Sequence, residues 1–596
     1  MTIDTDVLVV GAGPAGLTLS ALLASYGVRA LTVTRYPGTA NSPRAHITNQ
    51  RAMEVYRDLG IEGEVRAIAT PNELMSNNVW ATSFAGTEIA RLQTWGTGVR
   101  RKADYEAASP TSMCNAPQHI LEPVLRSAAE SRGADIRFLT ELVSVEQDAD
   151  GVTAVVRHRE TGVEETIRAL YVVGADGARS TVAEQLGFAF KGEMGLGAAL
   201  NIWVEADLTK YTEHRPGVLY WMTQPGNDYW VGSGTWICVR PFTEWVNLSM
   251  YDPADGEPDT SEEALLARVR STIGDPDIDV KIKAVSRWQI NHMVAEEYQK
   301  GRAFLVGDAA HRHPPANGLG SNTSVQDSFN LAWKLAFVLR GDASPALLES
   351  YTRERQPVGQ QVVDRAMKSV QDMAPVAKAL GFRPGQSLDD GWQNVDELFS
   401  ATPTGARRRE DLASAIELQN YQFNAHGVEL GQRYESTAVL DDGTPWPDSE
   451  RDRELYYQPT SKPGAPIPHA WLQHGTDRVS TIDVVGKGHF TLVTGIADPA
   501  WSEAAAIVAA ETGVPIRVAQ IAARGDYDDV LGDWAAVRGT YDDGCLLVRP
   551  DRVIAWRQES RPADPASALR AALATILGRP GAQVAVPAEP SAAVAG

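Results

Sequence analysis

The first stretch of the chain alternates clearly between apolar and polar segments. Residues 7–10 form an uninterrupted apolar run, which is typical of a strand buried on both faces of a parallel sheet. This run leads into the hexapeptide GAGPAG, followed by a helical pattern over residues 17–26 and a second strand pattern over 28–34. The order strand–GxGxxG–helix–strand predicts a dinucleotide-binding βαβ unit. Gly11, Gly13 and Gly16 would permit its tight turn, the approach of a pyrophosphate and close helix–strand packing.

The end of the second predicted strand departs from that pattern. An acidic residue usually binds the ribose hydroxyls there, but this chain has Thr34-Arg35. Arg35 is therefore our candidate for a contact with the adenosine part of a dinucleotide.

Two later strand patterns end in corners that contain glycine and aspartate. Residues 171–180, YVVGADGARS, place Asp176 at the end of one, and residues 303–322, AFLVGDAAHRHPPANGLGSN, place Asp308 at the end of the other. Open α/β sheets bind their ligands at the carboxyl ends of strands, and the turn 318–320 precedes a helical pattern over 324–339. Alone, 303–322 also fits a Pro/Gly loop with a capping Asp, the less favoured alternative; its pairing with the N-terminal fingerprint favours a ligand site further.

Residues 186–285 change character, because they are rich in aromatics that alternate as in strands. Such a sheet either walls an apolar ligand pocket or is an ordinary sheet core, and Trp221, Met222 and Trp236 are our pocket candidates. Long helices are expected over 324–380. From residue 468 the order β–α–β then β–β–α predicts a thioredoxin-like unit, which contains no CxxC and so is not expected to carry redox chemistry.

Composition narrows the function classes. The chain has 596 residues, is 43% hydrophobic and has a formal charge of −21, which argues against nucleic acid or an anionic membrane as a partner. The three cysteines are too scattered for a disulfide frame or a metal site. The first residues carry acids where a signal peptide would carry Lys or Arg, and no apolar run reaches a membrane-spanning length. We therefore expect a cytoplasmic protein without a metal.

Together, GAGPAG, VVGADGARS and GDAAHRHPPANGLGSN resemble the single-component, FAD-dependent aromatic hydroxylases. PRAHITNQRAMEVYRDLG, ASPTSMCNAPQ, NAHGVELGQRY and LLVRPDRVIAWR resemble the phenol-hydroxylase branch of that family. The resemblance implies tight, non-covalent FAD, transient NADH or NADPH, and a flavin C4a-hydroperoxide that hydroxylates a ring ortho or para to a hydroxyl. It also implies an aromatic small-molecule substrate, O2 as co-substrate and a homo-oligomer.

The resemblance also implies an α/β fold with a defined domain order. It comprises an FAD-binding Rossmann-like domain, an inserted mixed β-sheet substrate domain and the C-terminal thioredoxin-like domain. We expect the FAD-binding domain over 1–185, with 71–110 contributing to the substrate pocket, and again over 286–400. The substrate domain then spans 186–285, a linker 401–465, the thioredoxin-like domain 466–580 and a disordered tail 581–596.

The same resemblance assigns roles to individual residues. Pro315 is implied to lie near the flavin hydroperoxide, and His46 to deprotonate the phenol, a task that suits an imidazole. From the residues alone, Arg44 and His46 are equally a surface turn with capping residues. The residues implied to contact the cofactor are Gly11, Gly13, Gly16, Arg44, Gln118, Asp176, Asp308, Gly318, Leu319, Gly320 and Asn322.

Two departures from the phenol-hydroxylase pattern leave the substrate open. Asn115-Ala116-Pro117 stands where Asp-Leu-Pro is usual, and an amide keeps hydrogen bonding but cannot act as a base. The aromatic stretch 219–236 also differs. A hydroxypyridine or a polyketide-type natural product therefore remains the alternative to a degradative phenol. A non-hydroxylating FAD oxidoreductase and a non-catalytic FAD scaffold are the competing classes.

Overall fold

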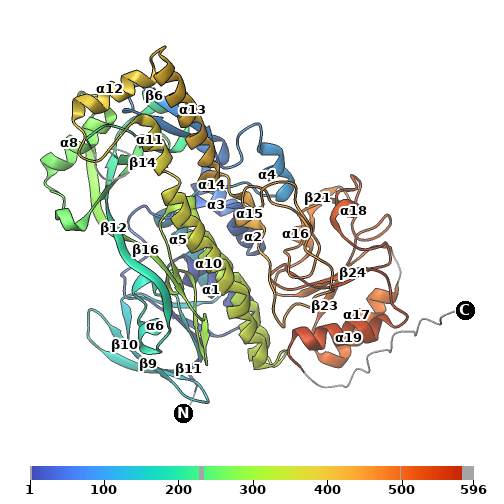
Figure 1. Ribbon diagram of the computed structural model, residues 1–596. Helices are drawn as coiled ribbons and strands as arrows, with labels where there is room; N and C mark the ends of the chain where they lie inside the picture. Colours follow the sequence, from blue (N-terminus) through green and yellow to red (C-terminus); the bar gives the residue numbers. More distant parts are fainter. Residues whose placement is uncertain (1–2, 227–233, 497–498, 580–596) are drawn as a thin grey trace, which may run out of the picture.

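The computed structural model describes residues 3–226, 234–496 and 499–579 (Figure 1). The tail predicted over 581–596 lies outside these ranges. The N-terminal part contains a sheet with a parallel core in the order β17-β18-β11-β1-β2-β8, to which the antiparallel hairpin β9-β10 is added at β11. Its strands are β1 (Thr5–Val10), β2 (Ala30–Val33), β8 (Asp135–Arg137), β9 (Thr140–Gln147), β10 (Val152–His158), β11 (Glu164–Gly174), β17 (Gln299–Lys300) and β18 (Ala303–Leu305).

The predicted βαβ unit is present. β1 pairs in parallel with β2, and α1 (Pro14–Ser25) connects them. α1 packs against α5 (Gln118–Ser131) and the long helix α9 (Gly320–Leu339), so a buried apolar core forms between the sheet and these helices. Shorter helices complete this part: α2 (Gln50–Asp58), α3 (Glu62–Ile68), α4 (Lys102–Ala108) and α6 (Thr181–Gln185).

The second large sheet is mixed and has the order β19-β16-β12-β15-β14-β13-β5-β6. Its strands are β5 (Asn77–Ala81), β6 (Glu88–Gln93), β12 (Phe190–Glu205), β13 (Gly217–Met222), β14 (Gly234–Arg240), β15 (Glu244–Tyr251), β16 (Lys281–Ala295) and β19 (His311–Arg312). α7 (Thr209–Thr212) and α8 (Glu262–Ile273) belong to the same part, and α8 covers one face of the sheet. The boundary predicted between residues 285 and 286 is wrong in detail, because β16 runs through it as one strand.

A three-stranded sheet connects the two large ones. It consists of β3 (Ile47–Thr48), β4 (Thr70–Pro71) and β7 (Cys114–Asn115), with β7 in the centre. Residues 44–49 and 114–118, which the sequence placed in separate polar turns, therefore lie side by side.

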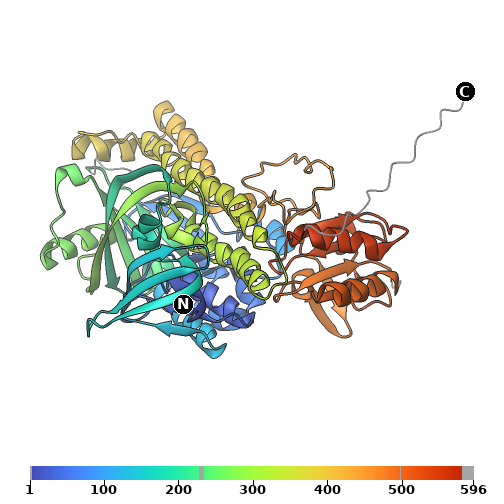
Figure 2. The ribbon, with the colours of Figure 1, turned by 90° about the horizontal axis from the view of Figure 1, so that it is seen from below.

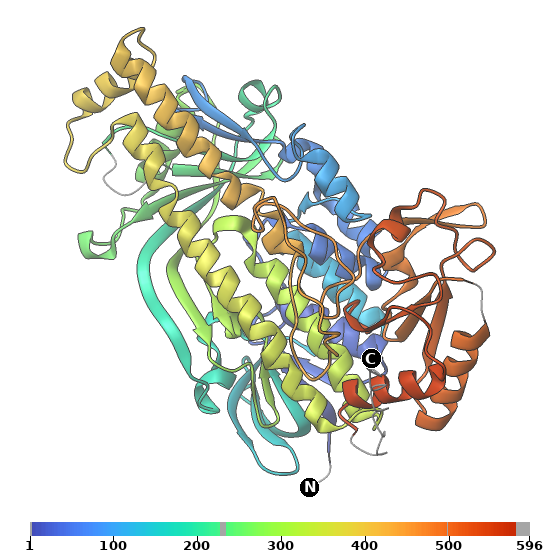
Figure 3. The same ribbon diagram turned by 45° about the vertical axis from the view of Figure 1, so that its right-hand side comes forward.

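A long helix, α10 (Glu349–Gln371), runs between the mixed sheet and the C-terminal unit (Figure 1). It is followed by α11 (Ala374–Leu380), α12 (Leu388–Leu398), α13 (Pro403–Leu418), α14 (Asn420–Phe423) and α15 (His426–Leu430). The segment predicted as a linker, 401–465, is therefore not free chain: its first part is a 16-residue helix, and its Ile416 and Phe423 are buried in a core. Its second part, 431–465, has neither helix nor strand and passes between α10 and the C-terminal unit (Figure 3).

The C-terminal unit lies at one end of the molecule (Figure 2). Its sheet has the order β23-β22-β24-β25, with β22–β23 parallel and the other pairs antiparallel. The strands are β20 (Trp471–His474), β21 (Asp477–Ser480), β22 (Phe490–Thr494), β23 (Ile516–Gln520), β24 (Cys545–Val548) and β25 (Ile554–Gln558). The helices are α16 (Thr481–Val484), α17 (Pro499–Thr512), α18 (Asp533–Val537) and α19 (Pro565–Ile576). A thioredoxin-like identity for this unit stays a prediction.

None of the helices in the described part of the chain is long and apolar enough to cross a membrane. Within the same residues, no group of three or more His, Cys, Asp or Glu side chains is arranged to hold a metal ion.

Candidate active site

The glycine-rich turn after β1 has two constrained glycines and one that faces open space. A Cβ on Gly11, whose φ is +111°, would lie 2.1 Å from the carbonyl oxygen of Ala175, and a Cβ on Gly16 would lie 1.9 Å from that of Gly11. A Cβ on Gly13 would meet nothing closer than 3.9 Å, the Oε1 of Glu122. Gly13 precedes α1, whose first turn has no acidic residue and no side-chain cap. The backbone N–H groups of that first turn are therefore available to an anion. This concave, electropositive turn fits the pyrophosphate of FAD.

Glu122, which the sequence did not single out, lies beside this turn. Its carboxylate accepts hydrogen bonds from the backbone N–H of Ala40 and from the side chain of Gln118, so Gln118 is held next to Gly13. The residue is 2% exposed, and burial raises its pKa, against the lowering effect of these two donors. A spacing of four residues on α5 brings Gln118 and Glu122 together, and this pair was visible in the sequence.

The two Gly/Asp corners meet at the carboxyl end of the same sheet. β11 pairs in parallel with both β1 and β18, and the turns that follow β11 and β18 contact each other. Asp308 is exposed there. Asp176 accepts from the N–H groups of Thr181 and Val182 through Oδ2, while its Oδ1 is buried without a partner among the described residues. Burial raises the pKa of Asp176, against the lowering effect of the N–H groups that its carboxylate accepts from.

His46 and Asn115 lie together where the three-stranded sheet meets the mixed sheet. The backbone N–H of Ala116 donates to the carbonyl of His46 at 2.8 Å, and the Asn115 side chain donates to the carbonyl of Cys238 on β14 at 2.9 Å. His46 Nδ1 and Asn115 Oδ1 are both buried without a hydrogen-bond partner among the described residues.

The environment of His46 lowers its pKa to about 3. Burial and the nearby His119 lower it, whereas the side chain of Asn115 and the carbonyl of Cys238 raise it. The sequence predicted a base with a near-neutral pKa, so the structure corrects this point: the imidazole is neutral at physiological pH. His119, which the sequence missed, also has a buried Nδ1 without a partner in the described residues, and its ring contacts Trp203 edge-on at 5.4 Å.

Hydrogen bonds connect the segment 315–322 to β3, the strand that follows His46. Asn322 donates to the carbonyl of Ile47 and accepts from the N–H of Asn49, both at 2.9 Å. Gly318, with φ +63°, is required because a Cβ there would lie 2.9 Å from that of Ile47. The side chain of Leu319 points into a separate apolar cluster. The structure therefore engages the Asn322 and Leu319 side chains in protein contacts and leaves only their backbone for a cofactor.

The remaining predicted cofactor contacts lie near the surface. Arg35 and Arg44 are part-exposed and exposed, and they donate to the Tyr36 hydroxyl and the Ser42 hydroxyl respectively. Pro315 is also exposed, and Gly320 lies against the ring of His313. Their contact with the cofactor stays a prediction.

The three predicted pocket residues do not share a face. Trp221 stacks on Trp80 with ring centroids 6.3 Å apart and belongs to the same apolar cluster as Ile47 and Met113, next to His46. Met222 and Trp236 lie on the opposite face, and the indole N–H of Trp236 donates to Thr272 on α8 at 3.0 Å. Met222 and Trp236 are thus core residues beneath α8, and the expectation that they line the pocket is corrected.

Comparison with known proteins agrees with this geometry. Residues 4–366 match the family described as FAD binding domain, and residues 460–580 match that described as aromatic-ring hydroxylase, C-terminal. The chain is 49% identical over 582 residues to 2,4-dichlorophenol 6-monooxygenase of Cupriavidus pinatubonensis (strain JMP 134 / LMG 1197), with 97% of each chain covered. It is 43% identical over 570 residues to phenol 2-monooxygenase of Pseudomonas sp. (strain EST1001), with 95% of this chain and 92% of the relative covered.

A solved structure is similar over the same length. The flavin-dependent monooxygenase PieE, in complex with FAD and substrate, superposes with a TM-score of 0.93 at 47% sequence identity, covering 97% of this chain and 100% of that one. The chain belongs to the family of FAD-dependent aromatic-ring hydroxylases. It is a monooxygenase that uses FAD and O2 on an aromatic small molecule, and NAD(P)H is the reductant typical of its class.

Proposed function

We propose that the enzyme hydroxylates a phenol-like ring, ortho or para to an existing hydroxyl. The observation that supports this proposal is a pair of buried polar atoms, His46 Nδ1 and Asn115 Oδ1, which have no hydrogen-bond partner among the described residues and lie next in sequence to members of the apolar cluster of Ile47, Met113 and Trp221. Buried polar atoms are normally satisfied, so this pair suits a ligand with one donor on an apolar ring. The names of the two phenol-specific relatives point to the same class.

His46 would accept the hydrogen bond of the substrate hydroxyl. A phenolate is a better nucleophile than a phenol, and the neutral imidazole is in the right form to take the proton. Its lowered pKa makes it a weak base, so we expect the Asn115 side chain and the Cys238 carbonyl, which both raise that pKa, to stabilise the protonated form. The carbonyl of Pro315 would lie near the reacting part of the flavin, and the turn over Gly318 and Gly320 would cover its ring.

The cofactor contacts follow from the same site. FAD supplies the oxygen-activating chemistry, and the protein supplies binding and orientation. Gly11, Gly13 and Gly16 would hold the pyrophosphate, and Asp308 the ribityl chain. Asp176 would face both FAD and the nicotinamide donor. Arg35, Arg44 and Gln118, with the backbone of residues 318–322, would complete the cofactor site.

Two further properties remain proposals. A homo-oligomer is expected from the family resemblance. A cytoplasmic location is consistent with three buried, unpaired cysteines, which suit a reducing compartment.

The test is oxidation of NADH and of NADPH by the FAD-loaded enzyme, with and without a panel of phenols, hydroxypyridines and polyketide-type phenols. Hydroxylated product and H2O2 are measured together. We expect a phenol to stimulate oxidation and to be converted with little H2O2. If only hydroxypyridines or polyketide-type rings are converted, the phenol proposal is wrong, and if no ring stimulates oxidation, the substrate class is wrong.

The role of His46 has its own test. In His46→Ala, kcat/KM at neutral pH should fall by about 10²-fold, with a smaller loss at alkaline pH, where a phenol of pKa about 10 begins to ionise in solution. The wild-type profile should show no His46 titration near pH 6.5, because burial keeps its pKa at about 3. Normal hydroxylation by His46→Ala across the neutral range would contradict the role.

A further inference from the structure

We propose that Asp327 is a positioning residue for the flavin site. It holds both ends of the turn that presents Asp308, and through Arg355 it connects this turn to the C-terminal unit. This role goes beyond the substrate and cofactor contacts given above, and it rests on the proposed contact between Asp308 and FAD.

The first step is the geometry at the turn. Asp327 lies on α9, and its Oδ2 accepts a hydrogen bond from the backbone N–H of Gly307 at 3.1 Å. The same oxygen lies 2.8 Å from Nε2 of His311. Gly307 and His311 flank Asp308 on its two sides, and both His311 and Asp327 are 0% exposed. One carboxylate oxygen therefore fixes the two ends of a five-residue turn.

The second step is the charge on Asp327. A buried carboxylate is stable only when it is paired, and Nε of Arg355, which is also 0% exposed, donates to its Oδ1 at 2.8 Å. Burial raises the pKa of Asp327, but Arg355 and His311 together lower it by more. The net shift of the pKa is therefore downward. Asp327 is therefore ionised, and each of its oxygens has a defined partner.

The third step leads from Arg355 to the C-terminal unit. Its Nη1 donates to the Gln432 side chain and to the Tyr434 hydroxyl, both at 2.7 Å. The N–H of Tyr434 donates to the carbonyl of Gly464 at 2.9 Å, and the N–H of Gly464 donates to the carbonyl of Ile554 on β25 at 2.8 Å. An unbroken series of polar contacts thus connects the flavin turn with the C-terminal sheet, along the segment 431–465 seen in Figure 3.

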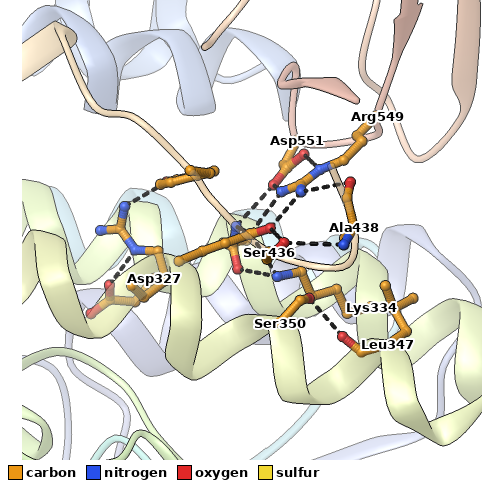
Figure 4. A network of polar contacts seen from close by, with 12 residues as sticks. Asp327, Lys334, Leu347, Ser350, Ser436, Ala438, Arg549 and Asp551 are labelled. Atoms are coloured by element: carbon orange, nitrogen blue, oxygen red, sulfur yellow. Dashed lines mark hydrogen bonds and ion pairs between the residues drawn. The ribbon is translucent and has the colours of Figure 1, made fainter. Parts of the chain in front are cut away.

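A second buried network nearby provides a matched control. Lys334 and Arg549 both pair with Glu354, at 2.7 and 2.6 Å, and all three side chains are 0% exposed. Figure 4 shows Asp327 to one side of this group, which includes Asp551. The control network also joins α9 and α10 to the C-terminal unit, but its hydrogen bonds do not reach residues 307–311. Loss of either network should therefore lower the temperature of unfolding, whereas only one should affect the flavin turn.

The experiment compares four full-length variants with the wild type: Asp327→Asn, Tyr434→Phe, Glu354→Gln and Asp308→Ala. We would measure the FAD dissociation constant by titrating FAD-stripped protein, the flavin reduction potential, and the midpoint of thermal unfolding. Asp327→Asn should raise the FAD Kd by about 10- to 100-fold, the range found for residues that orient ligand-binding groups elsewhere. Tyr434→Phe, a mild change that retains the ring, should raise the FAD Kd several-fold. The flavin reduction potential should shift in the same direction in Tyr434→Phe as in Asp327→Asn. Glu354→Gln should lower the unfolding midpoint and leave the FAD Kd within about twofold.

The outcomes separate the inference from the proposed site. If Asp308→Ala weakens FAD binding but Asp327→Asn and Tyr434→Phe do not, the positioning role is wrong and the proposed site stands. If Glu354→Gln weakens FAD binding as much as Asp327→Asn, the effect is general destabilisation and the positioning role is also wrong. If Asp308→Ala binds FAD normally, the proposed contact between Asp308 and FAD is wrong, and so is the positioning role of Asp327. Should Asp327→Asn fail to fold, Tyr434→Phe decides by the same criterion.

Discussion

At the scale of single residues, Gly11 and Gly13 occupy the same turn for different reasons. Gly11 has a positive φ, and a Cβ there would collide with the carbonyl of Ala175, so it is required by the protein itself. Gly13 has φ −84° and open space around it, so an alanine would be tolerated until a ligand approached. Gly11 is therefore needed for folding, whereas Gly13 is expected to be needed for cofactor binding.

Gly13→Ala should therefore change the unfolding free energy of the FAD-free protein by less than about 0.5 kcal/mol. Its FAD Kd should rise at least about tenfold, equivalent to 1.4 kcal/mol, because the new methyl group occupies the space of the pyrophosphate. Gly11→Ala should instead destabilise the FAD-free protein by about 2 kcal/mol or more. Chemical denaturation and FAD titration check the pair. Wild-type FAD affinity in Gly13→Ala would place the pyrophosphate elsewhere.

Glu122 gives FAD binding a pH dependence. Burial raises the pKa of Glu122, and only its ionised form repels a pyrophosphate at Gly13, with Arg44 as the nearby opposing charge. FAD Kd should therefore increase as pH rises through the pKa of Glu122, measured between about pH 5 and 9. Glu122→Gln should bind FAD more tightly at high pH and lose this dependence. Glu130→Gln, on the exposed side of the same helix, is the control and should retain it. An unchanged slope in Glu122→Gln would contradict the assignment.

At the scale of elements, the two faces of the mixed sheet have different tasks. The face with Trp221 shares its apolar cluster with Ile47 and Met113, whereas the face with Trp236 is filled by α8. Neighbouring residues on a strand point to opposite faces, so Trp221 and Met222 could never have lined one pocket together. The strand periodicity was readable from the sequence, but which face is covered depends on where α8 packs.

Conservative changes on the two faces should separate these tasks. Trp221→Phe should alter substrate KM and raise the share of NAD(P)H oxidation that ends as H2O2, with little effect on unfolding. Trp236→Phe should lose the hydrogen bond to Thr272, at a cost of about 1 kcal/mol in unfolding free energy, with substrate KM unchanged. Steady-state kinetics and thermal unfolding distinguish them. A changed KM in Trp236→Phe alone would reverse the assignment of the faces.

Within these elements, the sequence predicts some parts of the candidate site and not others. The glycine fingerprint and the Gly/Asp corners identify themselves, because their residue types are dictated by backbone geometry at strand ends. The pKa of His46 was not predictable, since it depends on burial between segments far apart in the chain. Asp327 was equally hidden: its partners Gly307 and Arg355 come from other elements, and only the folded chain brings them together.

At the scale of the whole molecule, the C-terminal unit is joined to the rest by buried charge. Arg549 donates to Glu354 and to Asp551, and Asn330 on α9 contacts both of these carboxylates. The sequence placed LLVRPDRVIAWR in the family but could not show that its Arg and Asp enter the core. An unpaired buried charge is costly, so the network specifies how the unit docks.

Arg549→Met should therefore lower the free energy of unfolding by about 3–5 kcal/mol, because it leaves two buried carboxylates with less compensation. Burial raises the pKa of Glu354, but Arg549 and Lys334 hold it below its usual value, so this pairing stabilises the protein above the unfolded pKa and is lost as pH falls. The gap between wild type and Arg549→Met should accordingly shrink as pH falls from about 5 toward 3. Arg570→Met, which breaks the part-exposed pair with Glu511, is the control and should leave the free energy of unfolding close to that of the wild type. Denaturation curves at several pH values test this; a gap that widened on acidification would show that Arg549 does not act through the buried carboxylates.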